Sequence, residues 1–186
     1  MTDEARPMRA DARRNYERIV TTARAMFAEH GVEVPLDDIA KKACVGPGTL
    51  YRHFPTRENL MAAVYREQID ALSQRAFDLL EQLTPGDALD AWVGEQVSWV
   101  ADRHGLAMTL KASLDAGSET FGWCRGRLNS ATATLVDAAQ RAGAIRADVT
   151  GVDLLRLGHG VGVAAQHASA EDTKRLLAVV LDGLHV

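Results

Sequence analysis

The sequence predicts an all-α fold in which a three-helix head precedes a larger helical body. Alanine is abundant, runs of β-branched residues are scarce, and only five of the 186 residues are proline, a composition that favours helices. Apolar residues recur at helical spacing, and no segment alternates convincingly at period two. We therefore expect about nine helices and no sheet, with one domain at residues 1–56 and a second at residues 57–186.

Turn and capping residues place the three helices of the head. The first helix is predicted from about residue 10 to residue 29, because its apolar residues share one face and Gly31 can end a helix. Pro35, followed by two acidic residues, opens a second helix. Pro47 opens a third, and Pro55 ends it. The head is therefore expected to contain two short helices packed on a longer one.

The body is predicted to begin with a long helix over residues 57–83 that has no internal breaker. The next four residues, 84–87, have the composition of a turn. Thr150 and Ser169 each precede an aspartate by three positions, so we expect capping boxes at the starts of the last two helices. The other helices of the body are predicted at residues 88–103, 106–116, 119–142, 151–168 and 170–184.

The composition indicates a cytoplasmic protein. No apolar stretch approaches the roughly 18 residues needed to cross a bilayer, and the basic N-terminus lacks the apolar core of a signal peptide. The two cysteines, Cys44 and Cys124, fit a reducing compartment better than a disulfide scaffold. The net charge is −4, but residues 1–57 carry +2 and the remainder carries −6. Such an asymmetry is typical of a nucleic-acid-binding head on an acidic body.

The segment 39–54 carries the clearest functional pattern, a short helix, a tight turn and a second short helix. On a helical wheel, Leu50 and Phe54 fall on one side of the second helix, next to Pro47 and Tyr51. The opposite side carries Gly48, Thr49, Arg52 and His53. The apolar side can anchor the helix, and the other side offers a hydroxyl, a cation and an imidazole. This pattern predicts a helix-turn-helix whose second helix enters the major groove of DNA.

These residues, together with a few around them, resemble the tetracycline-repressor (TetR) family of bacterial regulators. The likeness covers roughly residues 13–64 and is carried by Ala25-x-Phe27-x-x-x-Gly31, Ile39-Ala40, Gly48-Thr-Leu-Tyr-x-His-Phe54 and Leu60. The body is similar to the SbtR-like subgroup, through Arg141-Ala-Gly-Ala-Ile-Arg-Ala-Asp148 and Asp153-Leu-Leu. Members of this family are usually homodimers that repress transcription until a small molecule binds the body.

The resemblance implies a set of DNA-binding residues. Thr49, Tyr51 and His53 match positions that touch phosphates or bases, whereas Pro47, Gly48 and Arg52 match positions that face base edges. Arg57 matches a basic residue that binds the DNA backbone. Within the second helix, Arg52 is the only side chain able to contact guanine in bidentate fashion, worth about 1–3 kcal/mol of discrimination. Lys42 is either a further phosphate contact or a solvated residue.

The resemblance also implies that the last two helices form a dimer interface. The residues expected there are Leu154, Leu157, Gly158, Val161, Ala165, Leu177, Val180 and Leu181.

Three tryptophans in the body suggest an apolar cavity for a ligand, although an ordinary core explains them equally well. The residues predicted to line the cavity are Trp92, Trp99, His104, Met108, Phe121 and Trp123. Gly158, Gly160 and Gly162 are costly within a helix and indicate close helix packing, at a dimer interface or beside a ligand.

Other chemistry is not indicated. His159 and His167 are too far apart in sequence for a typical metal site, and no nucleophile is paired with a base at a readable spacing. Cys44 replaces a glycine that is usual in the family, which strains the turn if its backbone is left-handed. Its thiol is either a redox switch or simply a small residue tolerated in the turn.

We therefore expect a sequence-specific DNA-binding regulator, a homodimeric repressor released from a palindromic operator by a small apolar or aromatic ligand. We expect no enzymatic activity, no metal and no cofactor. The main alternative is an adaptor that binds DNA constitutively and recruits a protein partner. A helical enzyme or carrier with a vestigial head is a third possibility.

Overall fold

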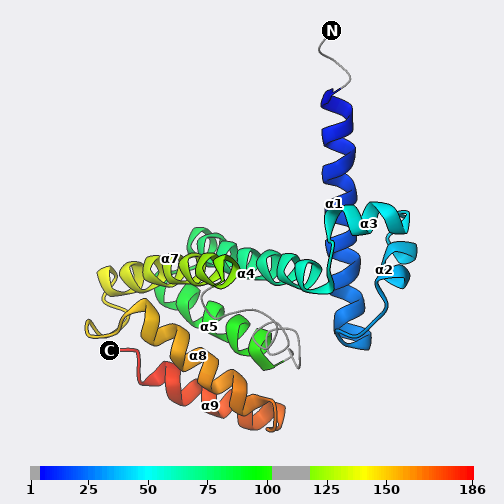
Figure 1. Ribbon diagram of the computed structural model, residues 1–186. Coiled ribbons are helices and arrows are strands. Elements are labelled where there is room, and N and C mark those ends of the chain that lie inside the picture. Colours follow the sequence, from blue (N-terminus) through cyan, green and yellow to red (C-terminus); the bar gives the residue numbers. More distant parts are fainter. Residues whose placement is uncertain (1–4, 102–117) are drawn as a thin grey trace. The chain divides into compact units, whose positions relative to one another are not determined.

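The structure is a computed structural model that describes residues 5–101 and 118–186 (Figure 1). The described residues form eight α-helices and no β-strand, which confirms the predicted fold class. The helices are α1 (Ala5–His30), α2 (Leu36–Lys42), α3 (Pro47–His53), α4 (Arg57–Gln82), α5 (Pro85–Ala101), α7 (Glu119–Arg141), α8 (Gly151–Ala165) and α9 (Ala170–Asp182). The helix predicted at residues 106–116 lies outside the described residues. Within the described ranges, no helix is both long enough and apolar enough to span a membrane.

Backbone contacts divide the chain into two compact units. Of the described residues, 5–67 belong to the first unit, and 68–101 with 118–186 belong to the second. The division lies inside α4, later than the predicted domain boundary at residue 56. The first turns of α4, where Leu60, Met61 and Val64 are buried, are therefore part of the head.

The head is built on α1, against which α2 and α3 pack. Ile19 and Ala23 of α1 and Ile39 of α2 are fully buried. Gly31 ends α1 with a φ of +81°, and its N–H donates to the carbonyl of Phe27 at 3.1 Å. The predicted glycine stop is confirmed. The start of α1 at Ala5 is earlier than the predicted residue 10, and Pro7 fits this start because proline is tolerated in the first turn of a helix.

The connection between α4 and α5 differs from the sequence prediction. Residues 84–87 were expected to be a turn, but α5 begins at Pro85. The Thr84 hydroxyl donates to the carboxylate of Asp87 at 2.6 Å and accepts from the Asp87 N–H at 3.4 Å. The threonine hydroxyl thus caps the helix start, with proline at the first helical position. The same residue types that favour a turn also favour a helix start, which explains the error.

In the second unit, α5, α7 and α8 pack around a common core, and α8 and α9 run side by side in opposite directions (Figure 1). The fully buried side chains include Leu89, Trp92, Leu135 and Leu154. Both predicted caps are present, since the side chains of Thr150 and Ser169 accept the N–H groups of Asp153 and Asp172. These caps fix where α8 and α9 begin.

The crossing of α5 and α8 depends on two glycines. A Cβ atom on Gly158 would lie 2.1 Å from Oε1 of Gln96, and one on Gly162 would lie 2.5 Å from Cβ of Val100. Nε2 of Gln96 also donates to the carbonyl of Leu155 at 3.0 Å. These glycines therefore allow α8 to approach another helix of the same chain.

Three residues of the predicted dimer interface are covered by their own chain. Leu154 is fully buried, Gly158 is buried against α5, and Val161 is only 9% exposed. Leu154 and Val161 belong to the core of the second unit. The contact of these three residues with a second chain stays a prediction. Helical periodicity identifies the face of a helix that is buried, but not which chain covers it.

Candidate DNA-binding site

The second helix of the helix-turn-helix, α3, is anchored by two side chains. Gly46 precedes it in an extended conformation, and its carbonyl accepts the N–H groups of Thr49 and Leu50 at 2.9 and 3.2 Å. Leu50 and Phe54 are 0% and 2% exposed. The helix start at Pro47 and the apolar anchor agree with the sequence prediction.

The outer face of α3 carries the residues that were predicted to reach DNA. Pro47, Gly48, Tyr51 and Arg52 are exposed, and Thr49 is half-buried. Tyr51 is 45% exposed, although the helical wheel placed it beside the apolar anchor. A hydroxyl, a phenol and a guanidinium are therefore available together on one solvent-facing surface. Their contact with DNA stays a prediction.

His53 lies at the end of α3 in an aromatic cluster with Tyr16 of α1 and Phe54. The ring centroids of Tyr16 and His53 are 6.2 Å apart at an interplanar angle of 70°, and those of Tyr16 and Phe54 are 5.1 Å apart. Nε2 of His53 is buried and has no hydrogen-bond partner within the described residues. Burial raises the pKa of the Tyr16 phenol. The predicted phosphate contact of His53 therefore requires Nδ1.

Arg57 has a different partner from the one predicted. Its Nη1 atom donates to the backbone carbonyls of Val32 and Val34 at 2.5 and 2.7 Å. The side chain is half-buried and bonds the loop between α1 and α2. The structure thus gives Nη1 of this guanidinium a role within the protein, and the DNA-backbone contact that the resemblance implied stays a prediction.

The turn between α2 and α3 is strained at Cys44. This residue has a φ of 53°, and the described residues contain no other non-glycine residue at positive φ. Its carbonyl accepts from Nη2 of Arg18 at 3.4 Å, and the same nitrogen donates to Oδ1 of Asn15 at 2.7 Å. The left-handed position that would make Cys44 a strained replacement for glycine is confirmed.

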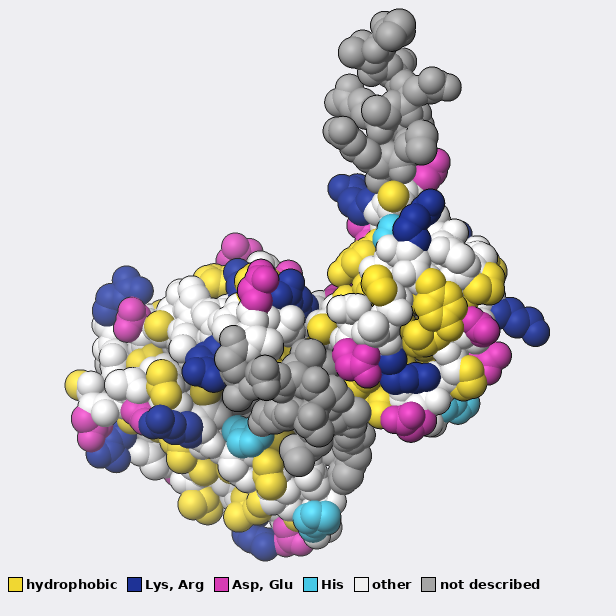
Figure 2. Space-filling model, in the orientation of Figure 1, with side chains coloured by type: hydrophobic (Ala, Val, Ile, Leu, Met, Phe, Trp, Pro, Cys, Tyr) yellow, Lys and Arg dark blue, Asp and Glu magenta, His cyan; other side chains and the backbone are white. Residues whose placement is uncertain are grey.

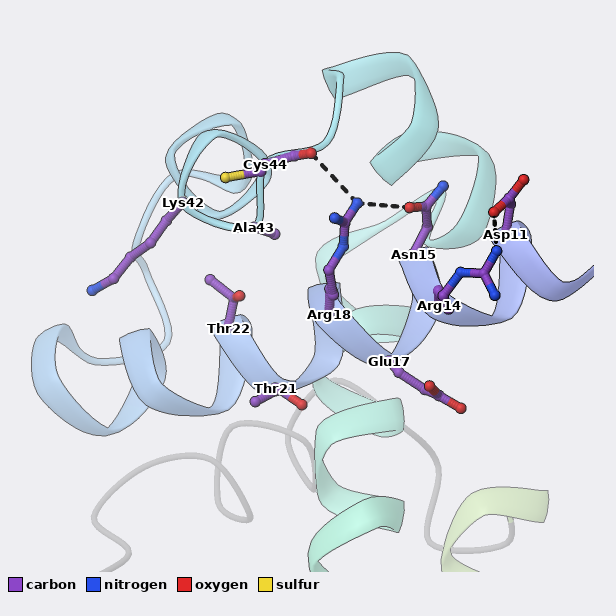
Figure 3. A pocket seen from close by; sticks show the side chains of 10 residues that line it. All are labelled: Asp11, Arg14, Asn15, Glu17, Arg18, Thr21, Thr22, Lys42, Ala43 and Cys44. Atoms are coloured by element: carbon purple, nitrogen blue, oxygen red, sulfur yellow. Dashed lines mark hydrogen bonds and ion pairs between the residues drawn. The ribbon is translucent and has the colours of Figure 1, made fainter.

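Arg18 and Cys44 belong to the wall of a polar groove in the head (Figure 3). The groove has a volume of about 860 Å³ and lies between α1 and the end of α2. It is lined by Asp11, Arg14, Asn15, Glu17, Arg18, Thr21, Thr22, Lys42, Ala43 and Cys44. Two of its basic side chains lie near carboxylates. Arg14 pairs with Asp11, and Nζ of Lys42 lies 3.9 Å from the carboxylate of Glu29.

Charges of both signs are mixed on the visible face of each unit (Figure 2). Lys42 is exposed, so it is available to a phosphate, although its weak pairing with Glu29 partly offsets its charge. On the face that Figure 2 shows, basic side chains are interspersed with acidic ones, and DNA binding by α3 stays a prediction.

Sequence reasoning missed Tyr16 and Arg18 of α1. Tyr16 packs against the end of α3, and Arg18 bonds the turn before it. Tyr16 lies three positions before the buried Ile19, so helical spacing could have assigned it to the packed side of α1. The bond from Arg18 has no sequence signal, because it joins residues 26 positions apart.

The residues that were predicted to line a ligand cavity differ in how deeply they are buried. Trp92 is fully buried, and its Nε1 donates to the carbonyl of Leu72 at 2.8 Å, so it serves as a core residue. Trp99 and Phe121 are half-buried, and Trp123 is 39% exposed. His104 and Met108 lie outside the described residues. The ligand role of the remaining aromatic residues stays a prediction.

The remaining residues of the predicted dimer interface lie nearer the surface. Leu157 is 38% exposed. Leu177, Val180 and Leu181 of α9 are half-buried and pack against the core of the second unit, and Ala165 of α8 is also half-buried. The outward face of α9 instead carries Leu176 and Val179, which are 39% and 66% exposed.

Family models match both halves of the chain. Residues 19–64 match the model for bacterial regulatory proteins of the tetR family, and residues 84–186 match the model for the C-terminal domain of SbtR-like transcriptional regulators. A helix-turn-helix transcriptional regulator of Staphylococcus aureus is 42% identical over 64 residues. That match covers 34% of this chain and only 35% of the relative.

Two solved structures match over nearly the whole length. A TetR transcriptional regulator of Streptomyces coelicolor is 36% identical, with a TM-score of 0.75, over 91% of this chain and 98% of that one. A TetR regulator of Mycobacterium vanbaalenii is 34% identical, with a TM-score of 0.77, over 97% of this chain and 100% of that one.

The same fold occurs in RolR, solved with the ligand resorcinol, at 18% identity and a TM-score of 0.65, over 95% of this chain and 90% of that one. The helix-turn-helix geometry, the model of the C-terminal domain and the two full-length structural matches agree. The chain belongs to the TetR family of helix-turn-helix transcriptional regulators.

Proposed function

We propose that the protein is a homodimeric repressor that binds a palindromic operator through α3 and leaves it when a small molecule binds the second unit. The observation that carries the proposal is the outer face of α3, where Tyr51 and Arg52 are exposed while Leu50 and Phe54 anchor the helix. The function is binding, without a catalytic step. Such a regulator acts on the bacterial chromosome and is therefore expected in the cytoplasm.

On DNA, the residues of α3 divide into readers and positioning contacts. Arg52 can donate two hydrogen bonds to O6 and N7 of guanine, whereas Pro47 and Gly48 allow close approach of the backbone. Tyr51, Thr49 and Nδ1 of His53 can bond phosphate oxygens and set the register. Lys42 adds a charge near the backbone. Base preference is thus expected to depend mainly on Arg52.

The proposed dimer uses apolar side chains of α8 and α9 that are exposed among the described residues. Leu157, Leu176 and Val179 are 38%, 39% and 66% exposed. Exposed apolar side chains that gather on one surface mark protein contacts. Pairing of two such surfaces about a twofold axis would give a symmetric four-helix contact. Two copies of α3 can then read half-sites about one DNA turn, or a multiple of it, apart.

An effector site inside the second unit is supported by buried polar atoms. Oε1 of Gln68 and Oγ of Ser73, both on α4, are buried and have no hydrogen-bond partner within the described residues. Such atoms are rare in folded proteins, so each calls for a partner. A mainly apolar molecule with a hydroxyl or amide donor would satisfy them. RolR, which shares the fold, binds the aromatic diol resorcinol.

The effector can release DNA only if it binds the DNA-free arrangement of the dimer more tightly than the DNA-bound one. The test uses a fluorescein-labelled duplex, recovered from random-sequence DNA by selection with the purified protein. Compounds from a panel of phenols and other apolar aromatics are added to the complex. We expect that a compound which lowers the anisotropy of the duplex also quenches tryptophan fluorescence.

The adaptor alternative predicts a different result. A protein that binds DNA constitutively keeps the duplex in the presence of every compound and shows no quenching of its tryptophans. Variants that replace Trp99 or Trp123 by phenylalanine identify which indole reports on the ligand. Loss of DNA without any change in tryptophan fluorescence would place the effector away from the aromatic residues.

A further inference from the structure

Arg57 joins two parts of the head that are far apart in sequence. It is the first residue of α4, and its Nη1 atom donates to the carbonyls of Val32 and Val34 in the loop between α1 and α2. Both distances, 2.5 and 2.7 Å, are short, as expected for donors that carry charge. One guanidinium nitrogen therefore bonds two carbonyls of the segment that leads into α2.

The position of α2 depends on such attachments because α2 is short. It has seven residues, of which Leu36, Ile39 and Ala40 are buried. Its start is fixed by Pro35, whose carbonyl accepts the N–H groups of Asp38 and Ile39 at 3.1 and 3.3 Å. A helix of this length is not stable by itself. Movement of the loop therefore moves α2 and, through the turn after it, α3.

We propose that Arg57 is a positioning residue for α3, holding the α1–α2 loop on the first turn of α4 and so fixing the presentation of the DNA-reading face. Its hydrogen bonds point to this role in place of a bond to a DNA phosphate. The same helix α4 continues to Gln82 in the second unit. Arg57 therefore connects the loop to the helix that is shared by both units.

A measurement without DNA tests the positioning role directly. Amide hydrogen exchange is compared between wild type and Arg57→Met, which keeps an unbranched apolar side chain but no donor. We expect exchange at Asp38 and Ile39 to accelerate by about ten-fold or more, the loss expected when a charge-assisted hydrogen bond is removed. Amides of α7, in the second unit, should exchange at the wild-type rate.

Arg24→Met is the matched control. Arg24 also faces α4, but its Nη1 lies 3.6 Å from the carboxylate of Glu67, and the two side chains are 45% and 39% exposed. Loss of an exposed ion pair has little effect, so exchange in α2 should match wild type. If Arg57→Met does not fold, Arg57→Leu replaces it, because leucine also lacks a donor. Equal exchange in α2 for wild type and the Arg57 variant would overturn the proposal.

A second measurement, which rests on the proposed function, separates positioning from phosphate binding. Affinity for the duplex selected from random-sequence DNA is measured at several salt concentrations. A positioning role predicts affinity about ten-fold weaker for Arg57→Met, with an unchanged dependence on salt. A phosphate contact predicts that the slope of log affinity against log salt becomes shallower by about 0.9. The shallower slope would overturn the proposal.

The two measurements distinguish failure of the proposed function from failure of the positioning role. If the wild-type protein selects no DNA, the proposed function fails, and hydrogen exchange still decides the role of Arg57. If the protein selects DNA but Arg57→Met leaves both exchange and affinity unchanged, only the positioning role fails.

Discussion

Cys44 occupies a position where most side chains are unfavourable. Its φ of 53° lies in the left-handed region, where the Cβ atom approaches the following carbonyl. The bond from Arg18 to its carbonyl holds the turn in this conformation. The turn fixes the spacing of α2 and α3, so the strain is retained at the centre of the helix-turn-helix.

Replacement of Cys44 by glycine should relieve this strain. We expect Cys44→Gly to raise the free energy of unfolding by about 1 kcal/mol, measured by urea denaturation. Cys44→Ser keeps the Cβ atom and a side chain of similar size, so its free energy of unfolding should match that of wild type. If glycine and serine variants are equally stable, the left-handed backbone at residue 44 carries no measurable strain.

The prediction about recognition of the DNA sequence concerns Arg52. Among the exposed residues of α3 it alone can hold a guanine with two hydrogen bonds. Arg52→Ala should lower discrimination at one base pair of each half-site by about 1–3 kcal/mol, measured by competition between selected duplexes. His53→Ala should instead weaken binding to all duplexes alike. Variants that bind every duplex like wild type would contradict the docking of α3 in the major groove.

At the scale of the elements, the two glycines of the α5–α8 crossing have a testable role. A Cβ atom on Gly162 would lie 2.5 Å from Cβ of Val100 and 3.0 Å from the carbonyl of Val97. Gly162→Ala should therefore lower the free energy of unfolding by about 1–3 kcal/mol, as overpacking does. Thermal and urea denaturation provide the measurement.

Gly160 provides the control in the same helix. Within the described residues, no atom outside the neighbouring backbone of α8 lies within 4 Å of a Cβ placed there. Gly160→Ala should leave stability unchanged or raise it by up to about 1 kcal/mol, because alanine favours the helix. A Gly162→Ala protein as stable as Gly160→Ala would show that α8 does not approach α5 as closely as described.

The C-terminal segment is held by a histidine with two acceptors. Nδ1 of His185 lies 3.0 Å from the carbonyl of Ala144, and Nε2 lies 2.9 Å from the carboxylate of Asp90 on α5. Only the protonated ring can donate to both, and the Asp90 hydrogen bond raises the pKa of His185 above 6.5. Asp182 adds a further negative charge in the same sense.

The pH dependence follows from this raised pKa. The stabilisation is complete below the ordinary histidine pKa of about 6.5 and is lost as pH rises through the raised value. The difference in unfolding free energy between wild type and His185→Gln should therefore be largest at about pH 5.5 to 6. At that pH, below the ordinary pKa of about 6.5, the histidine ring is protonated. Denaturation at a series of pH values measures it. A difference that grows toward alkaline pH would contradict the account.

The sequence predicted the elements well where single residues act as signals. Gly31, Pro47, Thr150 and Ser169 mark helix ends through backbone conformation or capping, and each does so in the structure. Thr84 also precedes an aspartate by three positions and caps α5, although the sequence predicts a turn there. Proline and glycine after a threonine fit both structures, and only the fold decides between them.

The candidate site could be predicted only in part, because periodicity describes single helices and not the contacts between them. Leu50 and Phe54 could be assigned to the buried side of α3 from their spacing alone. Spacing could not show that Arg57 bonds the carbonyls of Val32 and Val34, since those residues are distant in sequence. Nor could it show that Leu154 is covered by its own chain. Periodicity describes one helix, whereas these roles depend on packing between helices.

At the scale of the whole molecule, the two compact units share α4 as a continuous helix. The head presents α3, and the second unit offers uncovered apolar residues on α8 and α9. The proposed regulation needs both, because a dimer sets the separation of the two copies of α3. An effector that favours another separation then weakens DNA binding.

The most direct test of this account is selection of duplexes from random-sequence DNA by the purified protein, at low and at physiological salt. The account predicts a palindromic sequence whose half-sites are centred about one helical turn, or a multiple of it, apart. Binding should also weaken steeply with salt, since several phosphates are contacted. Recovery of no preferred sequence, or of a single half-site without symmetry, would contradict a dimeric reader that docks α3 in the major groove.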